Sequence, residues 1–324
     1  FHSPVRGYMN LTANQRELVK DFNRRVKEGS VLYEFLPCLC GSNEFELLAS
    51  VDKYSMLQDT ILCTKCGLIQ SNPRMAPEEY ANYYSSDFYR KCYESENYLN
   101  IYKDKYTVSE GRHIFDEINK IKKIAPGVSV LELGAGGGRN LLVFKEAGAN
   151  VFGLDYSPSL VSMGRQYGIN MQQGSIKEIT GEFDVIIINH AWEHFMDPVE
   201  SLKKIIQYMK KGGLVYIAVP NIINYCLEQL QNAHTYYFDP ETFNYYCCLS
   251  GLEPLVSGPA QVIHMFGIFK KAGQSAPGLS LEGHSRKMRK HLTNMMLKHY
   301  LKGCLIKMHM GKVIKIFRKH FRGL

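Results

Sequence analysis

The sequence predicts an α/β protein built around a doubly wound, largely parallel β-sheet. Between residues 121 and 272, short apolar segments typical of buried strands alternate with longer segments of helical pattern. The first apolar segment runs directly into a turn that contains Gly134, Gly136 and Gly138. The second ends on an acidic residue, Asp155. In doubly wound sheets, nucleotide-like ligands bind at this edge, outside the carboxyl ends of the strands.

The predicted strands of this sheet share an unbroken apolar character. Such runs suit strands that are buried on both faces, as parallel strands are in α/β proteins. We expect the first four to run parallel to one another. The segments are 130–133, 150–154, 184–189, 213–219 and 262–270.

The turn at 132–138 is suited to holding a ligand directly against the backbone. Glycine tolerates positive φ and close approach, and the helix that begins near Arg139 points free N–H groups at the same place. The dinucleotide fingerprint G-x-G-x-x-G fails because arginine occupies its last position. A carboxylate at Glu132 is unfavourable beside a pyrophosphate but favours a ligand with an ammonium and a sulfonium group. Asp155, 21 residues after Gly134, is placed to accept both hydroxyls of a ribose.

This combination of strand, acidic residue, glycine turn and second acidic residue resembles the class I S-adenosylmethionine (SAM) dependent methyltransferases. The resemblance covers residues 110–272 and implies a seven-stranded Rossmann-like sheet with an antiparallel last strand. It implies SAM as cofactor, with Ser175 in the place of an acidic residue that often binds the adenine amino group. The residues that it places around SAM are Arg112, Glu132, Gly134, Ala135, Gly136, Asp155, Tyr156, Ser175, Ile176, Asn189 and His190.

Composition limits the class of protein. A chain of 324 residues can hold one large domain and an accessory module. No apolar run approaches the ~20 residues of a membrane span, and no secretory signal is visible. An odd number of cysteines, nine, favours reduced thiols. We therefore expect a cytoplasmic protein.

Four of the cysteines, Cys38, Cys40, Cys63 and Cys66, form two close pairs separated by 22 residues, each pair followed by glycine. This pattern predicts a zinc ribbon that binds one structural Zn²⁺, because two such knuckles can offer four thiolates to a tetrahedral ion. The alternative is four reduced cysteines in a small core. With the run that follows to residue 84, the segment resembles bacterial methyltransferases that carry an N-terminal zinc ribbon and are associated with surface-polysaccharide or unusual-sugar biosynthesis.

Residues 74–124 are predicted to be helical and rich in tyrosine. Tyrosine combines a flat apolar ring with a hydroxyl, which suits stacking on a sugar or closing over a cofactor. The alternative is that these rings pack the ribbon against the core. The tyrosines are at positions 80, 83, 84, 89, 93, 98, 102 and 106.

The predicted catalytic residues follow the later strands. Methyl transfer needs alignment of the reacting atoms and a base for the leaving proton, and histidine suits that role near neutral pH. We rank His234 and His194 first, followed by Glu193 and His190. The H-x-x-E-H letters do not indicate a zinc peptidase, because that motif requires a helix. Alternatively, His190, Glu193 and His194 bind a divalent cation, as the resemblance to some ubiquinone-pathway O-methyltransferases implies.

Segment 220–243, placed between the last two predicted core strands, mixes aromatic and hydrogen-bonding side chains. This mixture suits a hydroxylated acceptor such as a sugar. The residues are Asn221, Asn224, Tyr225, His234, Tyr236, Tyr237 and Asp239.

The net charge of +8 belongs to the C-terminal tail. Residues 286–322 contain 12 Lys or Arg and no acidic residue, which leaves 27 basic against 31 acidic residues elsewhere. Apolar residues recur there at helical spacing, so the tail predicts basic amphipathic helices that contact an anionic membrane surface. The alternative is that the helices pack on the body or on a second copy in a homodimer.

These observations divide the chain into an N-terminal helical segment (1–30), a zinc ribbon (31–73), a helical linker or lid (74–120), a methyltransferase core (121–272) and the tail (273–324). We expect an O-methyltransferase acting on a small-molecule sugar or glycan intermediate, peripheral to the inner face of the membrane if the tail binds lipid. N- or C-methylation is the nearest variant. An RNA methyltransferase is the alternative, although the acidic body argues against nucleic acid. A SAM-binding protein without catalysis is a third class.

Overall fold

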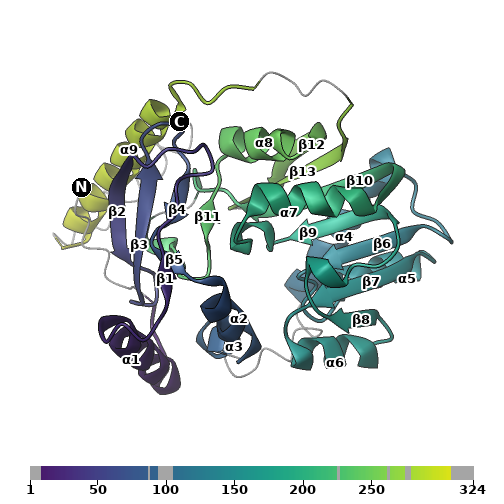
Figure 1. Cartoon of the computed structure of the whole chain (residues 1–324), viewed down its shortest axis with the longest axis horizontal. Coiled ribbons are helices and arrows are strands. Elements are labelled where there is room, and N and C mark those ends of the chain that lie inside the picture. The colour runs from purple at the N-terminus through teal and green to yellow at the C-terminus, as the bar shows by residue number, and fades with distance from the viewer. Residues whose placement is uncertain are drawn as a thin grey trace.

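The computed structural model describes residues 9–86, 88–93, 105–224, 227–260, 263–273 and 279–307. A seven-stranded sheet with its helices and a smaller four-stranded sheet lie on opposite sides of the molecule (Figure 1). A two-stranded antiparallel sheet, β1 (Tyr33–Glu34) paired with β5 (Arg74–Met75), lies beside the four-stranded sheet.

The large sheet has the strand order β12-β13-β10-β9-β6-β7-β8. The five strands from β8 to β10 are parallel, whereas β13 is antiparallel to both of its neighbours. This confirms the predicted doubly wound, seven-stranded sheet. The strands are β6 (Ser129–Leu133), β7 (Asn150–Asp155), β8 (Asn170–Gln173), β9 (Phe183–Asn189), β10 (Met209–Pro220), β12 (Leu252–Ala260) and β13 (His264–Lys271).

Strands β8 and β12 were not predicted. β8 is almost entirely polar and exposed, so it lacks an apolar run. β12 contains Pro254 and Pro259, which are tolerated because this strand lies at the edge of the sheet. Segment 220–243 lies between the two predicted strands 213–219 and 262–270, and the unpredicted strand β12 follows it before β13.

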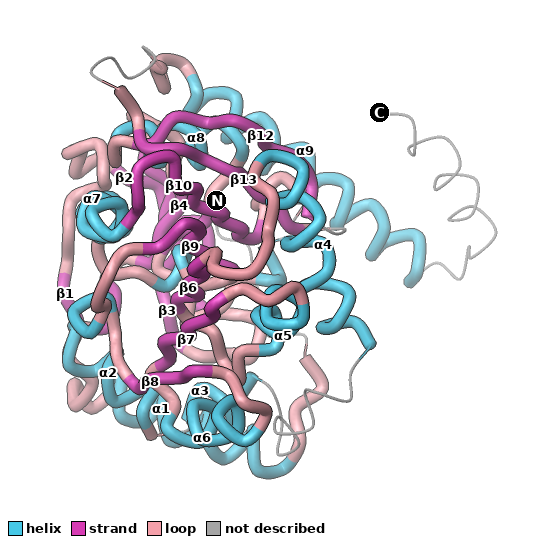
Figure 2. The backbone as a smooth tube through the Cα atoms, turned by 90° about the vertical axis from the view of Figure 1, so that its right-hand side faces the viewer, coloured by secondary structure: helices cyan, strands magenta, loops and turns pink. Residues whose placement is uncertain are grey.

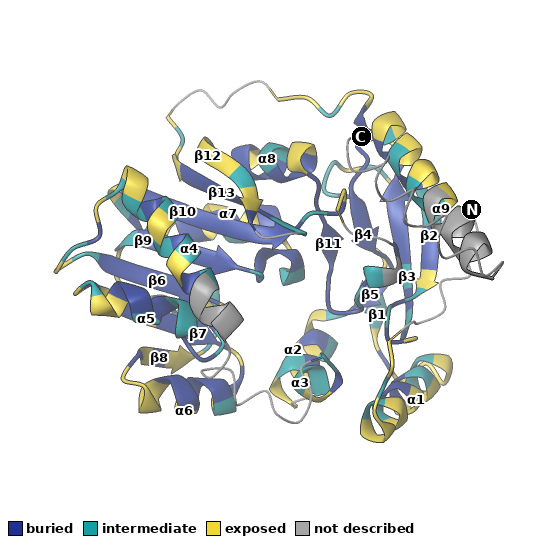
Figure 3. Cartoon of the chain, turned by 180° about the vertical axis from the view of Figure 1, so that it is seen from behind, coloured by how far each residue is buried: buried dark blue, intermediate teal, exposed yellow. Residues whose placement is uncertain are grey.

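Helices cover both faces of the sheet. α7 (Pro198–Ile205) lies on one face, and α4 (Lys105–Ile121) and α5 (Arg139–Glu146) lie on the other (Figure 2). Alternate residues of each strand enter two separate cores, as the two-residue period of a strand requires. The central strands of this sheet are largely buried, whereas the edge strands β8 and β12 are mostly exposed (Figure 3). The remaining helices of this part are α6 (Pro158–Gln166) and α8 (Pro240–Leu249).

The small sheet has the order β11-β4-β3-β2. Its strands β2 (Phe45–Val51), β3 (Leu57–Cys63) and β4 (Ile69–Ser71) belong to the predicted ribbon module, but β11 (Tyr236–Tyr237) comes from segment 220–243. Three helices of the N-terminal part lie nearby: α1 (Ala13–Lys27), α2 (Pro77–Ser85) and α3 (Phe88–Tyr93). The small sheet therefore includes residues from both predicted modules.

The C-terminal helix α9 (His284–Lys307) packs on the small sheet. Its Met288 and Leu292 are buried in a cluster with Leu48, Leu62 and Ile69. An ion pair of 2.8 Å between the Arg289 guanidinium and the Glu46 carboxylate supports the same contact.

This contact matches the alternative in which the tail packs on the body. The apolar residues of the first half of α9 are already covered by the ribbon, and residues 308–324 lie outside the described part of the chain. Within the described residues, no helix combines the length and apolar character needed to cross a bilayer.

Candidate active site

The glycine turn leaves bare backbone at the carboxyl edge of the large sheet. Gly134 and Gly136 have φ values of +67° and +55°, which side-chain-bearing residues rarely adopt. A Cβ added to Gly134 would lie 2.8 Å from the Cβ of Ala191, in the loop after β9. The turn and the loop after β9 are therefore in direct contact, as ligand binding across both would require.

Asp155 lies beside this turn, at the end of β7. One carboxylate oxygen accepts a hydrogen bond of 2.7 Å from the backbone N–H of Gly136, and the other accepts one of 2.9 Å from Ser157. The side chain is 6% exposed. Its orientation is therefore fixed at the position where the ribose of SAM was predicted. Tyr156, the next residue, is half-exposed and flanks the same edge.

Glu132 is an acidic residue that this protein buries almost completely. It is 1% exposed, and its Oε1 accepts a hydrogen bond of 2.7 Å from the Asn140 amide. Its Oε2 is buried and has no partner among the described residues. Burial raises the pKa of Glu132 to about 8. An unpaired acceptor of this kind suits a ligand with an ammonium group.

We expect binding of the SAM product, S-adenosylhomocysteine (SAH), to release a proton from Glu132. The free protein holds this carboxyl largely protonated at pH 7, because its pKa is about 8. A ligand ammonium stabilises the carboxylate and lowers that pKa, so roughly one proton leaves on binding. Calorimetry in phosphate and Tris buffers, whose ionisation enthalpies differ, measures the number released. Glu132→Gln should remove the buffer dependence; an unchanged dependence in this variant would assign the proton to another group.

Two predicted cofactor contacts have different surroundings from those expected. The Ser175 hydroxyl donates to the Glu178 carboxylate at 2.8 Å and caps a short 3-10 helix that begins at Ile176. The guanidinium of Arg112 lies over the ring of Phe115, 5.5 Å from its centroid, and the residue is exposed. The structure therefore does not bring Arg112 to the edge of the sheet.

Glu110 on α4 lies at the carboxyl edge of the large sheet, and it was not predicted as a site residue. Its Oε1 accepts a hydrogen bond of 3.2 Å from the Asn189 amide and lies 3.2 Å from His190 Nε2. Glu110 and Arg112 are two positions apart, so they point to different sides of the helix. An acidic residue on a helix has no distinctive sequence signal, and only the packing of α4 identifies it.

His190 lies between two carboxylates. Its Nδ1 is 3.8 Å from Glu193, and its backbone φ is +52°. Burial alone would lower the pKa of His190, but Glu110 and Glu193 outweigh burial and raise it to about 9. His190 is therefore a protonated residue that compensates the partly buried carboxylate of Glu110 and the buried carboxylate of Glu193, which makes it unsuitable as a base.

Glu193, His194 and His234 come together in a buried cluster. One ligand atom from each lies within 4.8 Å of the others. Glu193 is 2% exposed on its side chain, and although burial would raise its pKa, the protonated His190 beside it lowers the pKa to about 2. The cluster therefore contains one ionised carboxylate beside two imidazoles.

The hydrogen-bonding contacts of His194 involve its Nδ1. This atom lies 2.8 Å from the backbone carbonyl of Ala233 and 2.8 Å from the Tyr84 hydroxyl. In the tautomer with the proton on Nδ1, this nitrogen donates to the carbonyl, and Nε2, 3.9 Å from Glu193, keeps its lone pair. Burial lowers the pKa of His194, so this imidazole is neutral.

His234 is 4% exposed, and its Nδ1 has no hydrogen-bond partner among the described residues. Burial is the largest cause that lowers the pKa of His234 well below 6.5, with a smaller contribution from His194. The His234 ring lies 4.8 Å from the His194 ring and 5.5 Å from the Tyr237 ring. His234 therefore offers an unprotonated nitrogen inside an aromatic enclosure.

Some of the predicted tyrosines form the wall of this cluster. Tyr84 and Tyr89 meet the His194 ring at 6.0 and 6.2 Å. The hydroxyl of Thr235, next to His234, donates a hydrogen bond of 3.1 Å to the Tyr80 hydroxyl. These rings both pack the N-terminal helices on the core and line the histidines. Tyrosines 98 and 102 lie outside the described residues.

The structure changes the predicted cation-binding group. The set whose ligand atoms all lie within 4.8 Å of one another contains His234 in place of His190, although His190 also lies 3.8 Å from Glu193. The segment Trp192–His194 is a short 3-10 helix, which agrees with the rejection of a zinc-peptidase motif.

The four thiols of Cys38, Cys40, Cys63 and Cys66 also form a cluster. The Sγ atoms of Cys38 and Cys66 are 3.5 Å apart, and those of Cys40 and Cys63 are 3.7 Å apart. Four sulfurs at the zinc–thiolate distance of ~2.3 Å stand ~3.8 Å from one another, whereas a disulfide needs ~2.05 Å. The donors therefore fit a tetrahedral ion better than disulfides.

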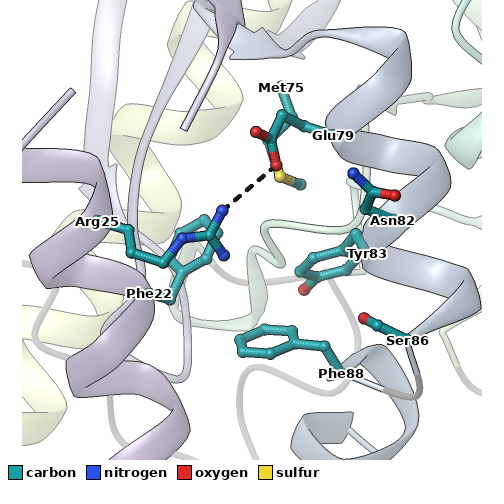
Figure 4. A pocket seen from close by; sticks show the side chains of 8 residues that line it. All are labelled: Phe22, Arg25, Met75, Glu79, Asn82, Tyr83, Ser86 and Phe88. Carbon is teal, nitrogen blue, oxygen red and sulfur yellow. Dashed lines mark ion pairs between the residues drawn. The ribbon is translucent and has the colours of Figure 1, made fainter. Parts of the chain in front are cut away.

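A cavity of about 130 Å³ lies elsewhere, between α1 and the α2–α3 pair. Figure 4 shows Phe22, Met75 and Tyr83 around it, and Arg25 reaches Glu79 across it at 3.6 Å. None of the predicted catalytic, SAM-binding or metal-binding residues lines it.

Comparisons with known proteins agree with the class that the fold and the turn indicate. Residues 106–255 match the family described as "Methyltransferase domain". The chain is 27% identical over 106 residues to a ubiquinone biosynthesis O-methyltransferase of Xanthomonas campestris, covering 30% of this chain and 44% of the relative. It is 27% identical over 142 residues to a trans-aconitate 2-methyltransferase of Deinococcus radiodurans, covering 42% and 55%. The chain thus spans about half the length of these curated relatives.

Among solved structures, the chain is similar to the 1,6-didemethyltoxoflavin-N1-methyltransferase of Burkholderia thailandensis, which was crystallised with SAH. The TM-score is 0.48 at 19% identity, covering 64% of this chain and 96% of that one. A Haloferax volcanii complex of the Trm112 activator with a methyltransferase gives 0.46 at 17% identity, covering 56% and 98%. The family match confirms the predicted methyltransferase domain.

Proposed function

We propose that this protein transfers a methyl group from SAM to a hydroxyl of a sugar or glycan intermediate. One observation carries the proposal: the bare glycine turn contacts the loop that presents Glu193 and His194, and His234 joins that loop. Cofactor binding and proton transfer can therefore take place in neighbouring positions. SAM, when bound, supplies an electrophilic methyl group on a positively charged sulfur.

The chain's own residues hold the acceptor and remove its proton. His234 is the preferred base, because its imidazole is neutral and its Nδ1 has no hydrogen-bond partner in the part of the chain that the structure describes. His194 is the second candidate through Nε2. The ionised Glu193 would stabilise a histidine that gains a proton. The enclosure keeps water away from the reacting atoms.

A sugar acceptor is favoured by the aromatic and polar lining and by the resemblance to methyltransferases of polysaccharide biosynthesis. Tyr84, Tyr89 and Tyr237 offer ring faces and hydroxyls around the histidines. Methylation at oxygen also agrees with the Xanthomonas relative, which is named as an O-methyltransferase.

Incubation with deuterium-labelled SAM and a panel of sugar nucleotides tests this proposal. A product heavier by one labelled methyl group, on oxygen, is the expected result. A label found on carbon or nitrogen would instead assign the protein as a C- or N-methyltransferase. Salt-sensitive methylation of tRNA or rRNA instead would favour the RNA alternative.

We propose that the four thiols bind one structural Zn²⁺. The purified protein is expected to contain about one zinc ion per chain, and Cys66→Ser to lose most of it, because three ligands bind more weakly than four. Metal analysis by mass spectrometry measures this. Cys92→Ser is the matched control, because Cys92 is a buried cysteine outside the cluster. Metal-free wild-type protein with four freely titrating thiols would contradict the proposal.

A further inference from the structure

The segment that carries His234 is structurally part of the small four-stranded sheet, which also contains the strands of the predicted zinc ribbon. Strand β11 starts two residues after His234 and pairs with β4, with Tyr236 opposite Gln70 and Tyr237 opposite Ile69. Glu193 and His194, in contrast, follow β9 of the large sheet. The two halves of the proposed catalytic cluster therefore come from different sheets.

Ser71, the last residue of β4, fixes the His234 backbone. Its hydroxyl donates a hydrogen bond of 2.8 Å to the carbonyl of His234, and its N–H donates one of 2.9 Å to the carbonyl of Thr235. Ser71 is 2% exposed and Thr235 is 1% exposed, so water does not compete for these bonds. The N–H of Thr235 in turn donates to the carbonyl of Glu193 at 2.8 Å. Ser71 thus holds His234 at the distance from Glu193 that the cluster needs.

The residues before His234 are held by the same part of the protein. The Asp52 carboxylate accepts a hydrogen bond of 3.0 Å from the N–H of Asn232, and the N–H of Lys53 donates to Leu230 at 2.8 Å. Both Asp52 and Lys53 lie in the turn that joins β2 to β3. From Leu230 to Tyr237, the loop therefore rests on the ribbon.

The thiol cluster is continuous with this support. The knuckle that contains Cys63 and Cys66 connects β3 to β4, and the N–H of Cys63 donates to the carbonyl of Leu68 at 2.8 Å. Ser71 is only five residues beyond Cys66. The start of β4 is thus set by the geometry of the knuckle.

We propose that the thiol-bearing ribbon positions His234 for methyl transfer through Ser71 and the β4–β11 pairing. This proposal rests on the proposed function, and it names Ser71 as a positioning residue. Disruption of the knuckle, by metal loss or thiol oxidation, then lowers turnover without releasing the cofactor. The reason is that the glycine turn and Asp155 belong to the other sheet.

Full-length Ser71→Ala tests this proposal, with Ser250→Ala as the matched control. Ser250 is also buried, and its hydroxyl also donates to a backbone carbonyl, that of Tyr246 at 2.7 Å, but it lies in the cap of α8. We expect Ser71→Ala to lower kcat roughly five- to thirtyfold, the effect of one lost buried hydrogen bond. The KM for SAM should stay within about twofold, as for a contact outside the cofactor site. Ser71→Thr, which keeps the hydroxyl, should recover most of the activity.

Hydrogen exchange followed by mass spectrometry gives a readout that needs no acceptor. Amides of residues 231–237 should exchange faster in Ser71→Ala and in chelator-treated wild-type protein, while those of β6 and β7 keep their protection. Equal kcat losses in Ser71→Ala and Ser250→Ala, or unchanged exchange at 231–237, would overturn the proposal. Wild-type protein that methylates no acceptor would refute the proposed function, while the exchange experiment would still test the support of His234.

Discussion

His234→Ala is expected to lower kcat by roughly 10²- to 10⁴-fold, the usual contribution of a general base. The physical reason is that His234 offers a neutral imidazole beside an ionised carboxylate, with an Nδ1 that no described residue pairs with. SAH affinity should stay near that of the wild type, because the glycine turn and Asp155 are untouched. Mass spectrometry of the product formed over time measures kcat, and calorimetry measures the affinity for SAH.

The control for this variant is His113→Ala. His113 is a partly buried histidine on α4 that packs against the Phe266 ring at 5.3 Å, away from the cluster. A kcat for His234→Ala equal to that of the control would leave His234 with a structural role only and would favour His194.

The pH profile provides a second check on the same residue. A base must be unprotonated, so activity falls as the pH falls through its pKa. Burial places the pKa of His234 well below 6.5. The fall of kcat/KM on the acid side of the pH profile should therefore have its midpoint below pH 6.5. A limb above pH 7 would indicate a different base.

Asp155→Ala is expected to weaken SAH binding by roughly 10²- to 10⁴-fold. A carboxylate that accepts both ribose hydroxyls makes two charge-assisted hydrogen bonds, each worth about 1.5–3 kcal/mol. The substitution also removes the acceptor of the Gly136 N–H, which holds the turn in its binding conformation. Calorimetry with SAH measures the change.

Asp116→Ala is the control for charge, because Asp116 is an exposed acidic residue on α4. Circular dichroism should show that both variants remain folded. Undiminished binding by folded Asp155→Ala would show that the ribose does not contact this carboxylate.

Local sequence signals predicted most of the large sheet. Its central strands are short apolar runs, and the glycine turn and Asp155 occur within a few residues of the strands that position them. Strand β8 was not predicted because its residues are mostly polar. Strand β12 was not predicted because it contains prolines, which are uncommon within strands. Both lie at the edges of the sheet, where burial imposes the weakest pattern.

The thiol cluster was also predictable, because knuckle spacing is a local property. The position of Arg112 was not predictable from the sequence. The packing of α4 turns Arg112 outward and brings Glu110 to the edge of the sheet instead. Likewise, the sequence provided many tyrosines, and only the packing of α2 and α3 selected Tyr84 and Tyr89 as neighbours of His194.

The sequence by itself determined the class of domain, the glycine turn and the cysteine knuckles, because each depends on residues that are close along the chain. The tertiary structure alone decided that His234 meets Glu193 and His194, and that β11 completes the ribbon sheet. These contacts join segments separated by about 40 and 160 residues. No local propensity encodes such pairs, since they form only when two sheets and the loop between them are folded together.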